Sequence, residues 1–225
     1  MKELSKEEAQ NRIAHRVARE YDDIGGNLIL NTGVGIPVLV PGYIKSSNVF
    51  IQAENGILGI GEEVPPEEGH PDLGNAARRP AKELPGCCYF DSSDSFGMIR
   101  GGHIDVTILG AFEVDQEASM ANYIIPNGKQ LGVGGAMDLA AGAKELVVTM
   151  QHRNKDGGTR VLKKCLLPIT APQSVSKLFT EYAYFKFENK KMILKEIAPD
   201  ITLDELKSIT EAEFEIDPDL STMPV

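Results

Sequence analysis

The sequence predicts an α/β fold: a mainly parallel, open sheet flanked by helices, with a hairpin near the C-terminus. Two observations favour this class. Short apolar segments alternate with helical segments over most of the chain, which is the pattern of a parallel sheet. One of them, residues 104–109, is largely apolar, as expected of a strand covered on both faces. The 225 residues show no internal repeat and no break in composition, so we expect one domain over residues 1–225.

A helix and a strand are expected first. Ser5 and Glu8 have the spacing of a capping box, which marks the start of a helix. Apolar residues then recur every four positions, at Ala9, Ile13, Val17 and Tyr21. We expect this helix to end at the glycine pair 25–26, and residues 27–30 to form a strand.

A glycine-containing corner follows, with the sequence Asn31-Thr32-Gly33-Val34-Gly35-Ile36-Pro37. Pro37 suits the first turn of a helix, so residues 37–43 are expected to form a short one. Such a corner can present backbone N–H groups to an anion, but a tight structural turn explains it equally well. Val38 stands where a G-x-G-x-x-G fingerprint needs its third glycine, so a dinucleotide site, and with it a nucleotide-binding oxidoreductase, is a poor match.

The next strand, residues 49–53, ends at Glu54-Asn55-Gly56. A carboxylate at the end of a strand lies where α/β folds place their chemistry. The alternative is an ordinary solvated residue at the start of a hairpin turn, which Asn-Gly favours. This stretch alone leaves the two interpretations evenly balanced.

The middle of the chain alternates loops with regular elements. Residues 62–85 are acidic and rich in proline and glycine, and they predict a flap or a partner-facing loop. Residues 91–94 can cap a helix that closes at the glycine pair 101–102. A strand over 104–109 and a loop over 110–130 follow.

A second glycine-rich segment, Gly132-Val133-Gly134-Gly135-Ala136-Met137-Asp138-Leu139, opens the next helix. Three glycines in four positions are entropically costly unless the backbone must approach something closely. This segment is therefore a second candidate anion or oxyanion site, and a strand over 145–150 follows it.

The C-terminal part predicts an extended segment over 161–167 and a short helix around Val175, Leu178 and Phe179. Alternating apolar and polar residues in 182–187 and 192–197 predict a hairpin. Thr202 and Glu205 form a further capping box, which begins the last helix.

Composition excludes several function classes. The net charge of −10 argues against a nucleic-acid binder and against docking on an anionic membrane. The three cysteines have no C-x-x-C spacing, and no metal site is expected. The N-terminal residues lack the apolar core of a secretory signal, and no apolar run approaches the ~20 residues needed to cross a bilayer. We expect a cytoplasmic protein.

Four ordered blocks carry a resemblance to a known family. They are the corner 31–37, Glu54-Asn55-Gly56, the segment 98–107 (Met-Ile-Arg-Gly-Gly-His-Ile-Asp-Val-Thr) and the segment 132–139. Together with residues 164–170 and the remainder of the chain, they resemble the β subunit of the 3-oxoacid (family I) coenzyme A transferases. The resemblance covers nearly the whole chain and implies the α/β fold of that family.

The resemblance implies that Glu54 is a nucleophile that attacks an acyl-CoA. An acyl-glutamyl anhydride and then a glutamyl-CoA thioester form, and a second carboxylic acid collects the CoA by the reverse route. A glutamate side chain has a reference pKa of about 4.3, so at neutral pH it needs no partner base. No cofactor is expected, because the coenzyme A thioester is a substrate.

The resemblance also implies oxyanion donors. Asn31 and the backbone around Gly135 and Ala136 are the candidates, while Gly33, Gly35 and Gly134 would shape the loops that face coenzyme A. Ala53 departs from the family, which often carries serine there, and the 62–85 loop keeps little common pattern. Because this loop differs from the family pattern, the acid substrates stay undecided between acetoacetate, butyrate, acetate and succinate.

The family's catalytic unit includes an α half, so we expect a separate α subunit in an α2β2 or larger assembly. Two rivals remain. One is an acyl-CoA hydrolase of the same fold, which would pass the glutamyl-CoA thioester to water. The other is a non-catalytic partner subunit, against which the joint presence of Glu54 and both glycine loops argues.

Overall fold

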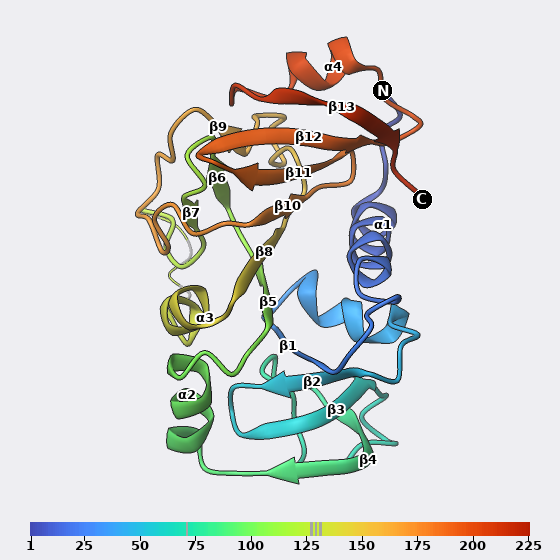
Figure 1. The fold of residues 1–225 in the computed structure, drawn as a ribbon, viewed down its shortest axis with the longest axis vertical. Helices are drawn as coiled ribbons and strands as arrows, with labels where there is room; N and C mark the ends of the chain where they lie inside the picture. Colours follow the sequence, from blue (N-terminus) through green and yellow to red (C-terminus); the bar gives the residue numbers. More distant parts are fainter. Residues whose placement is uncertain (71, 127, 129, 131) are drawn as a thin grey trace.

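The computed structural model describes residues 1–70, 72–126, 128, 130 and 132–225. Ten strands form one sheet in the order β13-β12-β11-β10-β8-β5-β1-β2-β3-β4, and a small second sheet has the order β7-β6-β9 (Figure 1). The elements are α1 (Lys6–Arg19), β1 (Leu28–Thr32), the 3-10 helix η1 (Pro37–Tyr43), β2 (Val49–Ala53), β3 (Ile57–Glu63), β4 (Ala81–Tyr89), α2 (Ser92–Arg100), β5 (Val106–Gly110), β6 (Glu113–Asp115), β7 (Met120–Ala121), α3 (Ala136–Gly142), β8 (Glu145–Thr149), β9 (Val161–Leu162), β10 (Lys177–Phe179), β11 (Ala183–Glu188), β12 (Lys191–Ile197), α4 (Leu203–Ser208) and β13 (Glu215–Thr222).

The centre of the large sheet is parallel. Strands β2, β1, β5, β8 and β10 pair in parallel, in that order. Antiparallel strands extend the sheet at both ends, with β3 and β4 beyond β2, and the hairpin β11–β12 beyond β10. The predicted fold class, a mainly parallel sheet flanked by helices with a C-terminal hairpin, is confirmed.

Helices cover both faces of the sheet. Figure 1 shows α1 on one side of the strands, with α2 and α3 on the other. Side chains alternate between faces along each strand, so Leu28 and Leu30 pack in the core with Ile13 and Val17 of α1. Ile29 faces the opposite core, which contains Ile99 of α2 and Leu139 of α3. The polar residues described below share this second face.

The capping boxes at Ser5 and Thr202 are both present. The first helix is shorter than predicted, however, because α1 ends at Arg19 and residues 21–23 form turns. Tyr21 leaves the helical stripe to donate its hydroxyl to Glu145 Oε1 at 2.6 Å. Its ring is buried in the same core as Ile13 and Val17 of α1.

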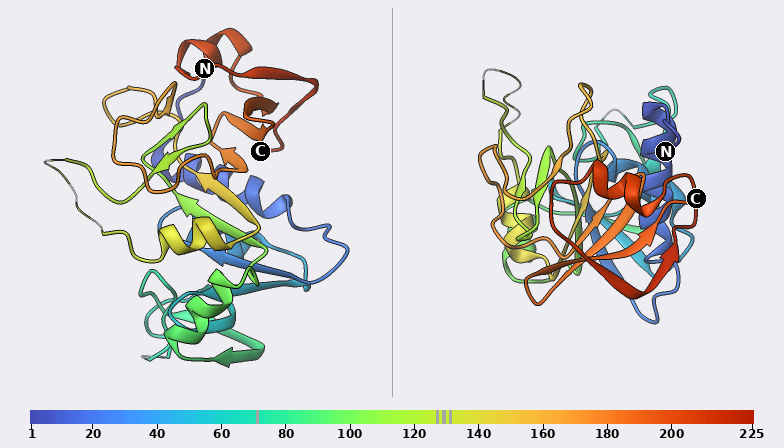
Figure 2. Two further views of the ribbon diagram at one scale, coloured as in Figure 1. Left: turned by 60° about the vertical axis from the view of Figure 1, so that its left-hand side comes forward. Right: turned by 90° about the horizontal axis from the view of Figure 1, so that it is seen from above.

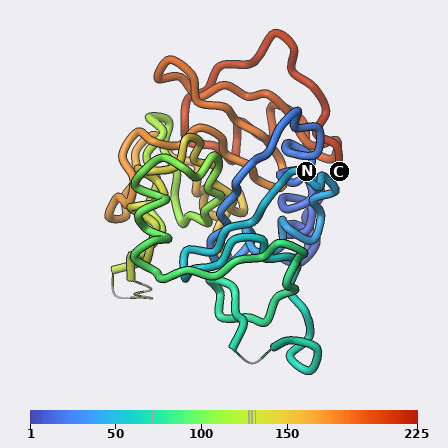
Figure 3. Tube along the Cα trace, turned by 60° about the horizontal axis from the view of Figure 1, so that its bottom comes forward, coloured from blue at the N-terminus to red at the C-terminus, as the bar shows by residue number. Residues whose placement is uncertain are grey.

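The expected loop over 62–85 is partly wrong, because β3 extends to Glu63 and β4 begins at Ala81. The described part of the connecting segment projects from the body of the molecule (Figure 3). Asn75 donates its amide to Glu63 Oε1 at 3.0 Å, which ties the segment to β3. Position 71 lies outside the described residues.

The expected loop over 110–130 contains β6 and β7, which pair with β9 in the small sheet. Two of its positions, 127 and 129, lie outside the described residues. The extended segment expected over 161–167 is a strand only at Val161–Leu162.

The short helix expected around Val175–Phe179 is wrong, because residues 177–179 form β10. This strand fills the gap between β8 and β11, and Leu178 and Phe179 are fully buried. Pairing on both sides overrides a local pattern too short to distinguish helix from strand. In the described residues, no helix is long and apolar enough to span a bilayer.

Candidate active site

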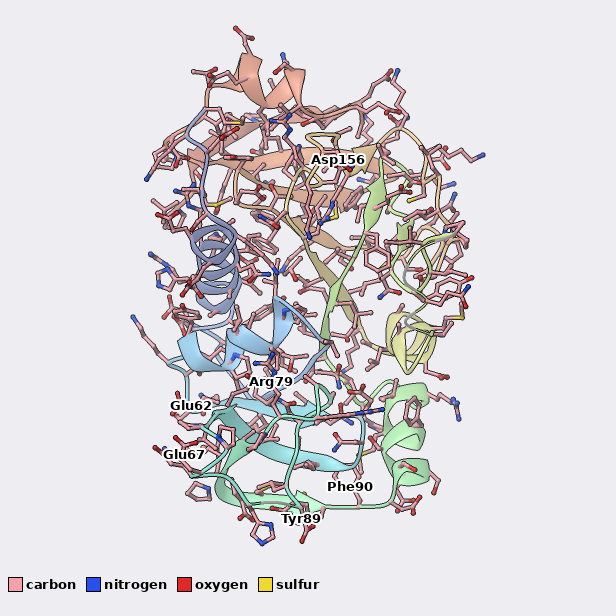
Figure 4. All side chains as sticks on the ribbon, turned by 180° about the vertical axis from the view of Figure 1, so that it is seen from behind. Glu62, Glu67, Arg79, Tyr89, Phe90 and Asp156 are labelled. Carbon is pink, nitrogen blue, oxygen red and sulfur yellow. The ribbon has the colours of Figure 1, made fainter. Side chains whose placement is uncertain are left out.

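Glu54 lies in the tight turn that joins β2 to β3, and it is half-buried. Gly56 closes this turn by donating its N–H to Ala53 O at 3.0 Å. Its φ of +120° favours glycine, and a Cβ there would lie 2.2 Å from Phe90 O. Figure 4 labels Phe90, which directly follows β4. The predicted hairpin turn is therefore real, and it holds Glu54 at the end of a buried strand.

A row of three buried polar side chains leads to this turn. Asn31 of β1 is paired in register with Gln52 of β2 on one side and with Thr107 of β5 on the other. All three are at most 1% exposed. The Asn31 amide donates to Gln52 Oε1 at 2.6 Å, and the Thr107 hydroxyl donates to Asn31 Oδ1 at 3.4 Å. The row thus crosses three neighbouring strands.

The row has one contact with the candidate nucleophile. Asn31 Nδ2 lies 3.4 Å from Glu54 Oε2, at the long end of hydrogen-bond distances. The same nitrogen donates to Gln52 O at 3.1 Å. The structure therefore brings together the two residues predicted to be catalytic.

The second glycine segment reaches Glu54 from the other side. Gly135 caps α3, and a Cβ at this position would lie 3.4 Å from Glu54 Cγ and 3.1 Å from Phe96 Cζ. A Cβ would therefore make an ordinary contact with Glu54 and a tight one with the Phe96 ring. The Ala136 N–H donates to Val133 O at 3.1 Å. The Gly135 N–H donates to no acceptor in the part of the chain that the structure describes.

The remaining predicted glycines have local structural roles. Gly33 donates its N–H to Ile108 O at 2.9 Å, and a Cβ there would lie 3.0 Å from Leu109 Cδ2. Gly35 is exposed with a φ of +99°, and Gly134 is exposed with a φ of +53°. Both can adopt these left-handed conformations without strain.

An ion pair joins the two helices beside Glu54. Arg100 of α2 donates to Asp138 of α3 at 2.7 Å, and its guanidinium lies 5.6 Å from the centre of the Phe96 ring. This hydrogen bond to Asp138 raises the pKa of Arg100. The pair bridges α2 and the first turn of α3 at the surface, next to Gly135.

The sequence reasoning missed Gln52, Ser95 and Thr107. Gln52 Nε2 donates to Ser95 Oγ of α2 at 2.7 Å, and Ser95 is fully buried. For Gln52 and Thr107 the available signal was a polar residue inside an otherwise apolar strand, since such groups are normally buried only with a partner. Ser95 lies in α2 and had no such signal. Among the described residues, no group of three or more His, Cys, Asp or Glu side chains is placed to hold a metal.

A surface cavity of about 470 Å³ is lined by residues of α1 and the loops near it: His15, Arg19, Asp22, Asp23, Lys45 and Ser46. It does not include Glu54 or its contacts. The hydrogen-bond geometry around Glu54, rather than cavity volume, therefore locates the candidate site.

Comparison with protein families matches residues 11–208 to the Coenzyme A transferase model. The chain is 44% identical over 216 residues to the beta subunit of the acetate CoA-transferase of Escherichia coli (strain K12), covering 96% of this chain and 97% of that protein. It is 45% identical over 206 residues to one subunit of the succinyl-CoA:3-ketoacid coenzyme A transferase of Helicobacter pylori (strain 26695), covering 91% and 97%.

Among solved structures, the chain is similar to the acyl-CoA transferase YdiF of Escherichia coli O157:H7. The apoenzyme gives a TM-score of 0.75 at 19% identity, over 100% of this chain and 45% of that one. A thioester complex of the same enzyme with CoA gives 0.69 at 21% identity, over 100% and 44%. The chain thus spans less than half of that enzyme, and the likeness concerns the fold.

Proposed function

Because this chain belongs to the coenzyme A transferase family, we propose that it is the β subunit of an enzyme that moves CoA from an acyl-CoA to a short-chain carboxylic or 3-oxo acid. The observation that carries the proposal is the convergence of Asn31 and Gly135 on Glu54. A carboxylate, an amide donor and a backbone segment without a side chain lie together there. These are the groups that acyl transfer through a carboxylate requires.

The proposed reaction is a ping-pong exchange through Glu54. Its carboxylate attacks the thioester carbonyl, the C–S bond breaks, and an acyl-glutamyl anhydride and CoA thiolate form. The thiolate then attacks the carboxyl carbon of Glu54 (Cδ), a C–S bond forms, and the first acid leaves as its carboxylate. The second acid reverses both steps and departs as the new acyl-CoA, so no proton needs to be transferred overall.

Asn31 is suited to one of these intermediates in particular. Its Nδ2 lies beside Glu54 Oε2, so it can donate to the oxyanion that forms at the Glu54 carboxyl carbon (Cδ) when the thiolate attacks. The Gly135 N–H, which has no acceptor among the described residues, lies in the same neighbourhood and is the candidate donor from the glycine segment.

The complete enzyme is proposed to include a separate α subunit, in an α2β2 or larger assembly. Support comes from the names of the relatives, each of which is one subunit of a transferase, and from their near-complete alignment with this chain. Their substrates suggest acetate, succinyl-CoA and 3-keto acids as the first compounds to test.

The test is to trap the covalent intermediate. The assembled enzyme is treated with acyl-CoA alone and then with borohydride, which reduces a glutamyl-CoA thioester to an alcohol. We expect inactivation, with peptide mass spectrometry placing the modification on Glu54, and we expect Glu54→Gln to lose about 10⁴-fold or more in turnover. Near-normal activity in Glu54→Gln would refute the mechanism. CoA release that needs no acceptor acid would identify a hydrolase.

A further inference from the structure

The buried polar row extends beyond the two proposed catalytic residues, to Gln52 and Ser95. We propose that Gln52, held by Ser95, is a positioning residue: its side-chain oxygen, beside its own backbone carbonyl, holds the Asn31 amide nitrogen in place next to Glu54. The inference rests on the proposed function, because it assigns a role to residues that act through Asn31.

The orientations of the Asn31 and Gln52 side-chain amides follow from one group, the backbone carbonyl of Gln52. Gln52 O is a backbone carbonyl and can only accept, and it lies 3.1 Å from the terminal Asn31 atom. That atom must therefore be Nδ2. The Gln52 side-chain atom 2.6 Å from it must be the oxygen. The other end of Gln52 is then Nε2, which needs an acceptor and finds Ser95 Oγ at 2.7 Å.

Burial makes this orientation strongly preferred. Asn31 and Ser95 are fully buried and Gln52 is 1% exposed, so water cannot replace a lost partner. If the Asn31 amide turned over, its Oδ1 would face Gln52 O, Gln52 Oε1 and the Glu54 carboxylate. Four hydrogen-bond acceptors would then face one another, with no N–H or O–H group to bridge them.

The arrangement also suits a nucleophile whose charge changes. Asn31 has two N–H hydrogens and three acceptors around them, and Glu54 is the most distant of the three. Glu54 passes from carboxylate to anhydride to thioester, so it cannot itself hold Asn31 in place throughout. The short bond to Gln52 can, and it keeps the donor aimed at Glu54 for each oxyanion.

The test is a double-mutant cycle in the assembled enzyme. Gln52→Leu and Ser95→Ala are each made alone and in the Asn31→Ala background. In the otherwise native enzyme we expect each to lower kcat by about tenfold or more, with KM changed less than about twofold. In the Asn31→Ala background the same changes should lower kcat by less than about twofold, because the residue they position is gone.

Ser119→Ala is the matched control. Ser119 is also buried, and its Oγ accepts from the Gln173 N–H at 3.2 Å in the small-sheet region. It should leave kcat unchanged even if thermal stability falls. If Gln52→Leu does not fold, the cycle is completed with Ser95→Ala, which changes the side-chain volume and shape less.

Two outcomes overturn the inference. Equal losses of kcat in the native and Asn31→Ala backgrounds would show that Gln52 and Ser95 do not act through Asn31. Native kcat in both single variants would show that they do not position it at all. Failure of the proposed function is distinguishable, since it would appear as absent borohydride labelling of Glu54 in the native enzyme.

Discussion

Asn31 is a candidate site residue in the sequence, a buried residue in the structure and an oxyanion donor in the proposed reaction. It is the last but one residue of β1, and its amide is fully buried between β2 and β5. A buried amide of this kind is retained only where its hydrogen bonds are satisfied. Asn31 satisfies them with Gln52 and Thr107 and still reaches Glu54.

For Asn31→Ala we expect kcat to fall by about 10²–10³-fold with little change in KM, because one preorganised oxyanion donor is lost. Asn31→Asp should be at least as damaging, since it places acceptors against Gln52 O and Glu54. Steady-state kinetics of both variants check this. A change confined to KM would remove Asn31 from the oxyanion role.

His152 is a buried residue outside the candidate site. Its Nε2 lies 2.9 Å from the Thr210 hydroxyl, which itself donates to Leu206 O, so Nε2 must carry the proton. Its Nδ1 lies 3.1 Å from the Thr180 hydroxyl. Burial, with a smaller contribution from Arg153, lowers the pKa of His152 to about 3.

This depressed pKa predicts acid lability. Below about pH 6.5 the unfolded chain binds a proton at His152 that the folded chain does not. The free energy of unfolding should therefore fall as pH drops from about 6.5 towards 3, by up to ~1.4 kcal/mol per pH unit from this residue. Urea unfolding at a series of pH values measures the slope, and His152→Gln should flatten it. An unchanged slope in the variant would contradict the assignment.

At the scale of elements, the N-terminus of α3 is the part of that helix that contacts the candidate site, through its N-cap Gly135. Gly135 has a φ of −86°, which any residue can adopt, so its requirement for glycine comes from space and not from backbone strain. A Cβ there would lie 3.1 Å from Phe96 Cζ, so the Phe96 ring would have to move slightly to admit a side chain.

Gly135→Ala should therefore fold normally and lose activity. We expect kcat to fall by about tenfold, because a Cβ would move the Phe96 ring and bring a side chain against Glu54. Gly26→Ala is the control, since a Cβ there meets nothing within 4 Å. Steady-state kinetics and thermal unfolding of both variants distinguish an effect on the active site from an effect on stability. Equal activity in the two would show that Gly135 does not limit the space around Glu54.

Some elements could be predicted from the sequence and others could not, for physical reasons. The capping boxes at Ser5 and Thr202 are local signals, and both helices begin there. Strand β10 has only three residues and depends on pairing with β8 and β11, which no local pattern reveals. Glu54 and Asn31 could be selected as a pair through family resemblance, whereas Gln52 and Ser95 became visible only when their hydrogen bonds were known.

At the scale of the whole molecule, the first helix stabilises the last strands. Arg16 of α1 forms two hydrogen bonds with Glu196 of β12, at 2.6 and 2.7 Å, and lies over the rings of Phe179 and Tyr184. Arg12 forms a similar pair with Asp200. Figure 2 shows that both termini lie near this region. The N-terminal helix and the C-terminal hairpin therefore form one structural unit.

We expect the purified chain to show no CoA transfer by itself and to gain it when mixed with a separate α subunit. The physical reason is that a half-buried Glu54 at a surface turn leaves most of an acyl-CoA exposed to water unless another surface covers it. Transfer assays on each chain and on the mixture, with analytical ultracentrifugation, check this. CoA transfer at the full rate by the chain alone would refute the requirement for a separate α subunit.

The alignment of Thr107, Asn31 and Gln52 across β5, β1 and β2 has a consequence for folding fidelity. A one-residue slip between β1 and β2 would turn Gln52 to the opposite face of the sheet. Such a chain could be compact and rich in strand, so circular dichroism would not distinguish it from the native state. Turnover would, because the donor beside Glu54 exists only in the correct register. Specific activity after refolding is thus a direct measure of how often this sheet is assembled without error.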